Sequence, residues 1–178
     1  VHMLISLNTN IPRYLVEIYF DTEILGYFAA ISYLVVNNVN VFTSALSRVV
    51  IPRFSKLIHK SKLIDAKKLL RKFEFIGLIL GLLSISIVYL FGKEILILVY
   101  GTTYGDYANI FNILILSTIF IFISSFHGFF ITSARYFKIQ PFLGFIWIIT
   151  SVTLGLLLTP KYGIEGVAYS VVLVSIIQ

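Results

Sequence analysis

The chain has 178 residues, of which 58% are hydrophobic and 12% are charged, and its mean hydropathy is +0.96. Soluble domains carry about 25% charged residues, so too few charges remain here to cover a large soluble helical core. Cysteine is absent from the sequence, which excludes disulfide bonds, thiolate metal sites and cysteine nucleophiles. The composition therefore indicates an integral membrane protein that crosses the bilayer several times.

Five long stretches without Asp, Glu, Lys or Arg, from residue 24 onward, indicate five predicted membrane spans, and the apolar segment before them is the end of another. A helix needs roughly 20 mainly apolar residues to cross ~30 Å of hydrocarbon. In chain order, the predicted spans are about 1–20, 24–50, 73–91, 107–133, 140–159 and 164–178. The expected fold is all-α, a polytopic transmembrane helical bundle of about six spans. Because the chain begins and ends inside apolar stretches, we expect residues 1–178 to be a single helical lobe, truncated at both ends, of a longer protein.

The connection 51–72 is strongly basic, with eight Lys and Arg residues opposed only by Asp65. Arg135 and Lys138 lie in the link that follows the span 107–133. By the positive-inside rule both links are cytoplasmic. A nucleic-acid-binding patch is the other interpretation of such a charge run, but orientation explains it fully, so no nucleic-acid partner is expected. Membrane lipids with anionic headgroups are the expected partners of this loop.

The polar residues of the span 24–50 gather on one face. They advance by steps of three and four and fall within roughly 80° of arc on a helix. They are Tyr33, Asn37, Asn40, Ser44 and Ser47, with Arg48 bordering this stripe at its cytoplasmic end. The stripe must face protein or water, because polar groups facing lipid are costly. It either hydrogen-bonds neighbouring helices or lines a hydrated cavity, and its length of roughly 20 Å favours the cavity.

The segment NIPRYLVE, residues 10–17, combines a proline with two charged residues. Glu17 follows Arg13 by four positions, a spacing that allows an ion pair on a helix. Pro12 inside a span would mark a kink or a broken helix, a feature of transporter binding sites. Alternatively, this stretch lies at the outer interface and Arg13 reaches water there. The sequence leaves both interpretations open.

His127 lies inside the span 107–133, beside Ser124, Ser125 and Gly128. It is a candidate for a proton relay, and the alternative is a packed, neutral histidine that makes a hydrogen bond. Metalloprotease, Walker-type and nucleophile-elbow motifs are absent from the sequence. We therefore expect no enzymatic activity, no cofactor and no metal site.

Three segments carry a resemblance to a known family. They are SLNTNIPRYLVE with LGYFAAISYLV after it, IPRFSKL at the end of the polar span, and FGKEILILVYGTTYGDYANIFNIL. Together they resemble the bacterial polysaccharide flippases, which transport O-antigen and capsule repeat units within the multidrug/oligosaccharidyl-lipid/polysaccharide exporter superfamily. The resemblance covers nearly the whole chain and matches the second six-helix lobe.

The resemblance implies a function and a location. A protein of this family has about twelve or more helices in two lobes around a central cavity, and it works by alternating access in the bacterial cytoplasmic membrane. Its substrate is an undecaprenyl-diphosphate-linked oligosaccharide, moved from the cytoplasmic to the outer leaflet, and polysaccharide polymerase machinery is a further expected partner. By motif position, Arg13 and Arg48 would bind the diphosphate, and Asn37, Asn40 and Ser44 would bind sugars.

Three other functions compete with a flippase. A cation-coupled multidrug exporter of the same superfamily would need acidic residues within the spans. In this chain only Glu17 and Glu74 come near the hydrocarbon, and we expect both at its margins. A membrane enzyme of polysaccharide assembly would need a large outer loop, whereas the longest outer connection here, 92–106, has about fifteen residues. A structural scaffold without transport would not require the polar stripe.

Overall fold

The computed structural model describes residues 2–178, and it describes side chains from residue 7 onward. Val1, the first residue of the predicted span 1–20, lies outside the described residues. The described chain consists of α-helices and one short 3-10 helix, η1, without a strand. The elements are α1 (His2–Tyr19), α2 (Thr22–His59), α3 (Leu63–Tyr100), η1 (Thr102–Tyr107), α4 (Ala108–Ile115), α5 (Ser117–Ser133) and α6 (Ile139–Ile177). The predicted all-α fold is therefore confirmed.

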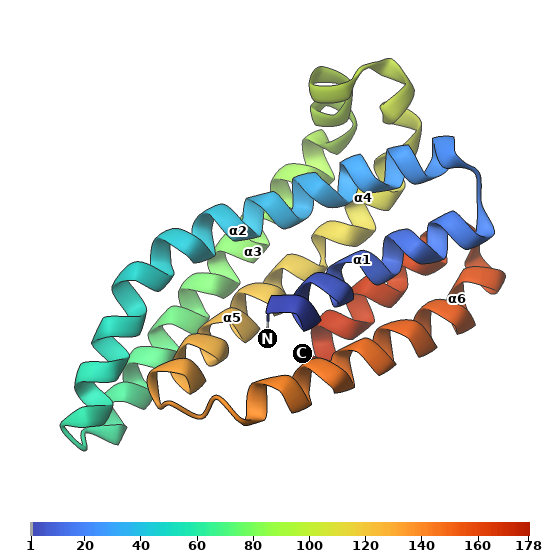
Figure 1. Ribbon diagram of the computed structural model, residues 1–178. Coiled ribbons are helices and arrows are strands. Elements are labelled where there is room, and N and C mark those ends of the chain that lie inside the picture. Colours follow the sequence, from blue (N-terminus) through green and yellow to red (C-terminus); the bar gives the residue numbers. More distant parts are fainter. Residues whose placement is uncertain (1) are drawn as a thin grey trace.

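The helices form an elongated bundle with its chain reversals at two ends (Figure 1). We call the end that holds the α2–α3 turn the basic end, and the opposite end, which holds η1, the η1 end. Four helical segments of the described chain are long and apolar enough to cross a membrane. They are Thr22–His59, Leu63–Tyr100, Thr102–Ser133 and Ile139–Ile177.

The α2–α3 hairpin is longer than the predicted spans. Each helix has 38 residues, or about 57 Å at 1.5 Å per residue. The connection 51–72 is helical except at residues 60–62. Charged residues end a membrane span without ending a helix, because Lys and Arg are good helix formers. The hairpin is thus longer than the ~30 Å of hydrocarbon and carries its basic residues at the tip.

The helix α6 consists of two arms joined at Gly163. The backbone there has φ 62° and ψ −143°, a left-handed φ that glycine adopts without the steric cost of a Cβ. Pro160 precedes the reversal within the same element. Figure 1 shows the two arms running back along each other, so the reversal falls between the predicted spans 140–159 and 164–178.

Close helix packing holds the η1 half together. A large apolar cluster, the η1-end core, joins α1, α2, α3, α4 and the second arm of α6, and includes Phe28, Leu96 and Val167. Glycine allows close approach between helices, and Gly81 of α3 lies against Ile119 of α5. A smaller cluster at the basic end contains Val50, Phe54, Phe73 and Phe126.

Candidate functional site: a polar cavity within the bundle

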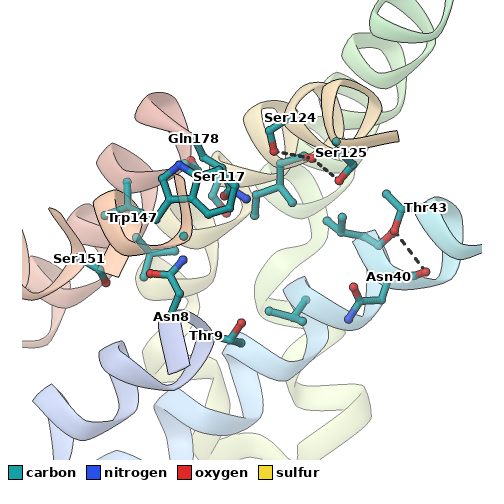
Figure 2. A pocket seen from close by; sticks show the side chains of 18 of the residues that line it. Asn8, Thr9, Asn40, Thr43, Ser117, Ser124, Ser125, Trp147, Ser151 and Gln178 are labelled. Carbon is teal, nitrogen blue, oxygen red and sulfur yellow. Dashed lines mark hydrogen bonds between the residues drawn. The ribbon is translucent and has the colours of Figure 1, made fainter. Parts of the chain in front are cut away.

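A cavity of about 750 Å³ lies between α1, α2, α5 and both arms of α6. The cavity borders the η1-end core, because its lining shares three residues with that core: Phe28, Val35 and Leu114. From there its lining extends to Ile51 and Thr132 near the basic end. Figure 2 shows side chains from these helices pointing into the same space. The bundle is therefore hollow between these helices and densely packed at the η1 end.

On α1, Arg13 lines the cavity and is half-buried. Its Nη1 donates a long hydrogen bond of 3.4 Å to Asn10 Oδ1. The ion pair that the spacing to Glu17 allows is not formed, and the ion pair found among residues 7–178 joins His127 to Glu74 instead. The helix continues through Pro12 without a break. The break in the helix that Pro12 was expected to mark is therefore not found, whereas Arg13 lies in the wall of the cavity.

The face of α2 toward the cavity differs partly from the predicted stripe. Asn40 and Ser47 line the cavity together with Ser32, Val36 and Thr43. The remaining stripe residues are exposed and lie outside the cavity lining; they are Tyr33, Asn37, Ser44 and Arg48. The helix α2 therefore has two polar surfaces, one toward the cavity and one on the outside of the described bundle.

On α5, hydroxyl groups and His127 line the cavity. Ser124 and Ser125 each donate a hydrogen bond to the Ile121 carbonyl of their own helix, at 3.2 and 2.6 Å, and Ser117 donates one of 2.7 Å to the Leu114 carbonyl of α4. Such local bonds satisfy the hydroxyl hydrogen and leave an oxygen that can still accept. His127 lines the cavity together with its sequence neighbours Ser124, Ser125 and Gly128.

The two arms of α6 contribute lining residues that the sequence analysis did not identify. In Figure 2, Trp147 and Ser151 of the first arm and Gln178 at the end of the second surround the same space. Gln140 closes the link to α5 by donating a hydrogen bond of 2.9 Å to Thr132 Oγ1. The positions 140, 144, 147 and 151 lie at helical spacing on one face of the first arm, a pattern that could have been found in the sequence.

Unpaired polar atoms concentrate around the cavity. Five buried side-chain atoms in the described chain lack a hydrogen-bond partner, and three of them belong to lining residues. These three are Asn8 Oδ1, Arg13 Nε and Ser32 Oγ. A buried polar group without a partner costs about 1–3 kcal/mol, so the wall is suited to a polar occupant that would supply the missing bonds.

The electrostatic character of the cavity is positive. Arg13 is its one permanently charged lining residue among those described, and no Asp or Glu contributes to the lining. A guanidinium group keeps its charge at any physiological pH. A partly buried cation without a carboxylate partner favours an anion or water beside it. The cavity can thus accept a polar, negatively charged group, with hydroxyls and amides around it.

One curated relative gives this cavity a biological context. The chain is 32% identical over 166 residues to the capsular polysaccharide biosynthesis protein CapF of Staphylococcus aureus. The match covers 93% of this chain and 42% of the relative, so the chain spans less than half of that protein's length. No protein family model and no solved structure matches the chain. The similarity and the long apolar helices fit a membrane protein of polysaccharide biosynthesis.

Proposed function

We propose that this chain is a lobe of a flippase that moves an undecaprenyl-diphosphate-linked oligosaccharide from the cytoplasmic to the outer leaflet of the bacterial cytoplasmic membrane. It would act by alternating access in the biosynthesis of a surface polysaccharide. The observation that carries this proposal is the cavity of about 750 Å³. Its size lies within the range of small-molecule sites, about 300–1,000 Å³, and its wall places Arg13 and several hydroxyl and amide side chains among apolar ones.

Arg13 is the residue we propose to attract the diphosphate. Its Nε is buried without a hydrogen-bond partner, and its Nη1 donates only a long hydrogen bond of 3.4 Å to Asn10 Oδ1. A guanidinium offers phosphate oxygens two parallel donors, which makes such pairs stronger than neutral hydrogen bonds. The wall of the same cavity on α2 supplies amide and hydroxyl groups of the kind that bind sugar hydroxyls, from Asn40, Thr43 and Ser47.

The exposed polar surface of α2, outside the cavity, supports a substrate path that extends beyond the cavity. Asn37, Ser44 and Arg48 are exposed on a helix whose other exposed residues include Val41 and Phe42. Exposed amides and a guanidinium would be costly against lipid tails. We propose that the remainder of the protein, outside this chain, lies opposite this surface and that the sugar part of the substrate passes between them.

The competing transport function receives less support from this cavity. A cation-coupled exporter of cationic drugs would require carboxylates near its substrate, and the described lining contains none. A positive lining repels cations and attracts anions. The lipid-linked diphosphate is therefore the substrate that we propose, with polymerase machinery acting on the product.

The full-length protein, expressed in a bacterium that lacks its own flippase, tests the proposal. We expect Arg13→Gln to leave lipid-linked repeat units in the cytoplasmic leaflet and to reduce surface polysaccharide at least tenfold, which corresponds to about 1.4 kcal/mol. Arg53→Gln is the matched control, because Arg53 is exposed and lies outside the cavity lining. Both variants should reach the membrane in wild-type amounts. Normal distribution of repeat units in Arg13→Gln cells would contradict the proposed role.

A further inference from the structure

A second pocket lies at the basic end, apart from the large cavity. Its volume is about 450 Å³, and residues from the last turns of α2 and from the α5–α6 junction line it. We call it the basic-end pocket, and its lining residues are Ser55, Ile58, His59, Ser133, Ala134 and Arg135. These six residues are all outside the lining of the large cavity.

Hydrogen bonds hold the wall between this pocket and the large cavity. Ser133 Oγ lies at hydrogen-bond distance from two carbonyl oxygens, that of Phe129 at 2.7 Å and that of Ile51 at 3.2 Å. Ile51 lines the large cavity, and so does Thr132, which accepts the hydrogen bond from Gln140. The end of α5 is therefore fixed against α2, and a ligand in the basic-end pocket would bind apart from the occupant of the large cavity.

Arg135 supplies the permanent positive charge of the pocket. Its backbone has φ 61°, a left-handed value that glycine adopts at lower cost than other residues. This turn ends α5, with the Tyr136 N–H donating a hydrogen bond of 3.2 Å to the Ile131 carbonyl, and it places Arg135 in one pocket with Ser55 and His59 of α2. A guanidinium binds phosphate oxygens with two parallel donors.

The charge around the pocket is positive and lacks a compensating carboxylate. No Asp or Glu belongs to the lining, and no ion pair of Arg135 is found among residues 7–178. Lys60 follows His59 directly and Lys138 follows Arg135 by three positions, and both lysines are exposed. His59 has an N–H donor even as a neutral ring, and Ser55 has a hydroxyl. A phosphate group would neutralise this charge and accept these hydrogen bonds.

Exposed aromatic residues beside Arg135 indicate that the phosphate belongs to a lipid. Tyr136 and Phe137 follow Arg135 in the chain and are 70% and 54% exposed. Aromatic side chains gather at the level of the lipid headgroups, and the eight Lys and Arg residues of the connection 51–72 mark this end as the cytoplasmic one. A free phosphate ion would make no use of these rings, whereas a phospholipid bound at Arg135 would extend its chains past them.

We propose that the basic-end pocket binds the headgroup phosphate of an anionic phospholipid from the cytoplasmic leaflet, with Arg135 as the main donor. This site differs from a general attraction of the connection 51–72 to anionic lipids, because Arg135 lies in another link and a single headgroup is held among defined residues. The bound lipid would join the end of α2 to the α5–α6 junction. The site does not rest on the proposed transport function.

Native mass spectrometry of the full-length protein in detergent, titrated with phosphatidylglycerol, tests the site. Arg135→Gly is the informative variant, because glycine keeps the left-handed turn while the guanidinium is lost. We expect one phosphatidylglycerol molecule to bind more tightly than the others, and its affinity to fall about fivefold in Arg135→Gly. Arg135→Gln, which keeps a side chain at this position, should show the same loss. Lys68→Gln is the control and should leave the affinity unchanged, because it removes a charge from the same end of the bundle outside the pocket.

The choice of lipid and anion decides what the pocket recognises. Wild-type affinity in both Arg135 variants, or equally tight binding of phosphatidylcholine, would overturn the proposal. Displacement of phosphatidylglycerol by an equal concentration of inorganic phosphate would assign the pocket to a free anion, and tighter binding of undecaprenyl diphosphate would assign it to the proposed transported lipid. Either of these results would also overturn the phospholipid site. Loss of transport with phosphatidylglycerol binding retained would contradict the proposed function alone.

Discussion

The polar residues at the η1 end of this bundle and those around the cavity have different surroundings. At the η1 end, polar side chains join one element to another: Asn109 donates a hydrogen bond of 2.7 Å to Glu165 of α6, and the Tyr100 hydroxyl donates one of 3.3 Å to the Ala30 carbonyl. In the half with the cavity, Asn8, Arg13 and Ser32 carry buried atoms without partners. The division is not complete, because Asn112 Oδ1 and Thr159 Oγ1 outside the cavity also lack partners and Gln140 pairs with Thr132 beside it.

This difference separates structural polarity from functional polarity. A paired polar group in a membrane bundle contributes to helix association, and its loss should lower stability. An unpaired group on a cavity wall already bears the cost of desolvation, so its removal should leave stability unchanged and weaken the binding of a ligand. Substitutions in the two halves of the full-length protein can test this distinction.

The largest expected effect comes from filling a close contact between α3 and α5. A Cβ added at Gly81 would lie 2.8 Å from the Ile119 Cα, where the backbone cannot yield. We expect Gly81→Ala to lower the free energy of unfolding by about 1–3 kcal/mol, measured by thermal or denaturant unfolding in detergent. Gly128→Ala is the matched control, because Gly128 lines the cavity and nothing lies within 4 Å of its added Cβ. Equal destabilisation by both substitutions would remove the contrast between the halves.

A smaller effect is expected from two matched asparagine substitutions. Asn109→Leu removes the bond to Glu165 and should lower stability by about 1 kcal/mol, since the pair is exposed. Asn40 lines the cavity, and Asn40→Leu should change stability by less than about 0.5 kcal/mol while reducing polysaccharide export. The comparison requires unfolding curves and an export assay for both variants. Retained export in Asn40→Leu, or a stability loss as large as that of Asn109→Leu, would speak against a functional role for Asn40.

The membrane helices could be predicted from the sequence because one property dominates them. The absence of Asp, Glu, Lys and Arg over each stretch is readable without neighbours, and Pro160 with Gly163 indicates the reversal in α6. Helix ends were harder to predict. The helix α2 continues past its predicted span to His59, and α3 begins before its predicted span, at Leu63. Both helices include basic residues, because charge limits the membrane span and not the helix.

The orientation of each helix face could only be predicted in part. The stripe on α2 was built from every polar residue at helical spacing, but the cavity face includes Val36 and omits Asn37 and Ser44. Which side of a helix meets a cavity depends on its neighbours, which periodicity does not reveal. The pairing of His127 with Glu74 has the same origin, because it links two helices that are distant in the sequence.

The most direct test of the account asks which positions meet water. Single cysteines at three serines of an otherwise cysteine-free full-length protein would be treated in membranes with a charged thiol reagent. Ser125 is half-buried in the cavity lining, Ser170 is buried outside it at the packed end, and Ser86 is exposed among Leu82, Leu83 and Ile87. The account predicts fast reaction at Ser125→Cys and slow reaction at the other two, because the cavity holds water while lipid covers Ser86 and side chains cover Ser170. Fast reaction at Ser86→Cys with none at Ser125→Cys would contradict a hydrated cavity.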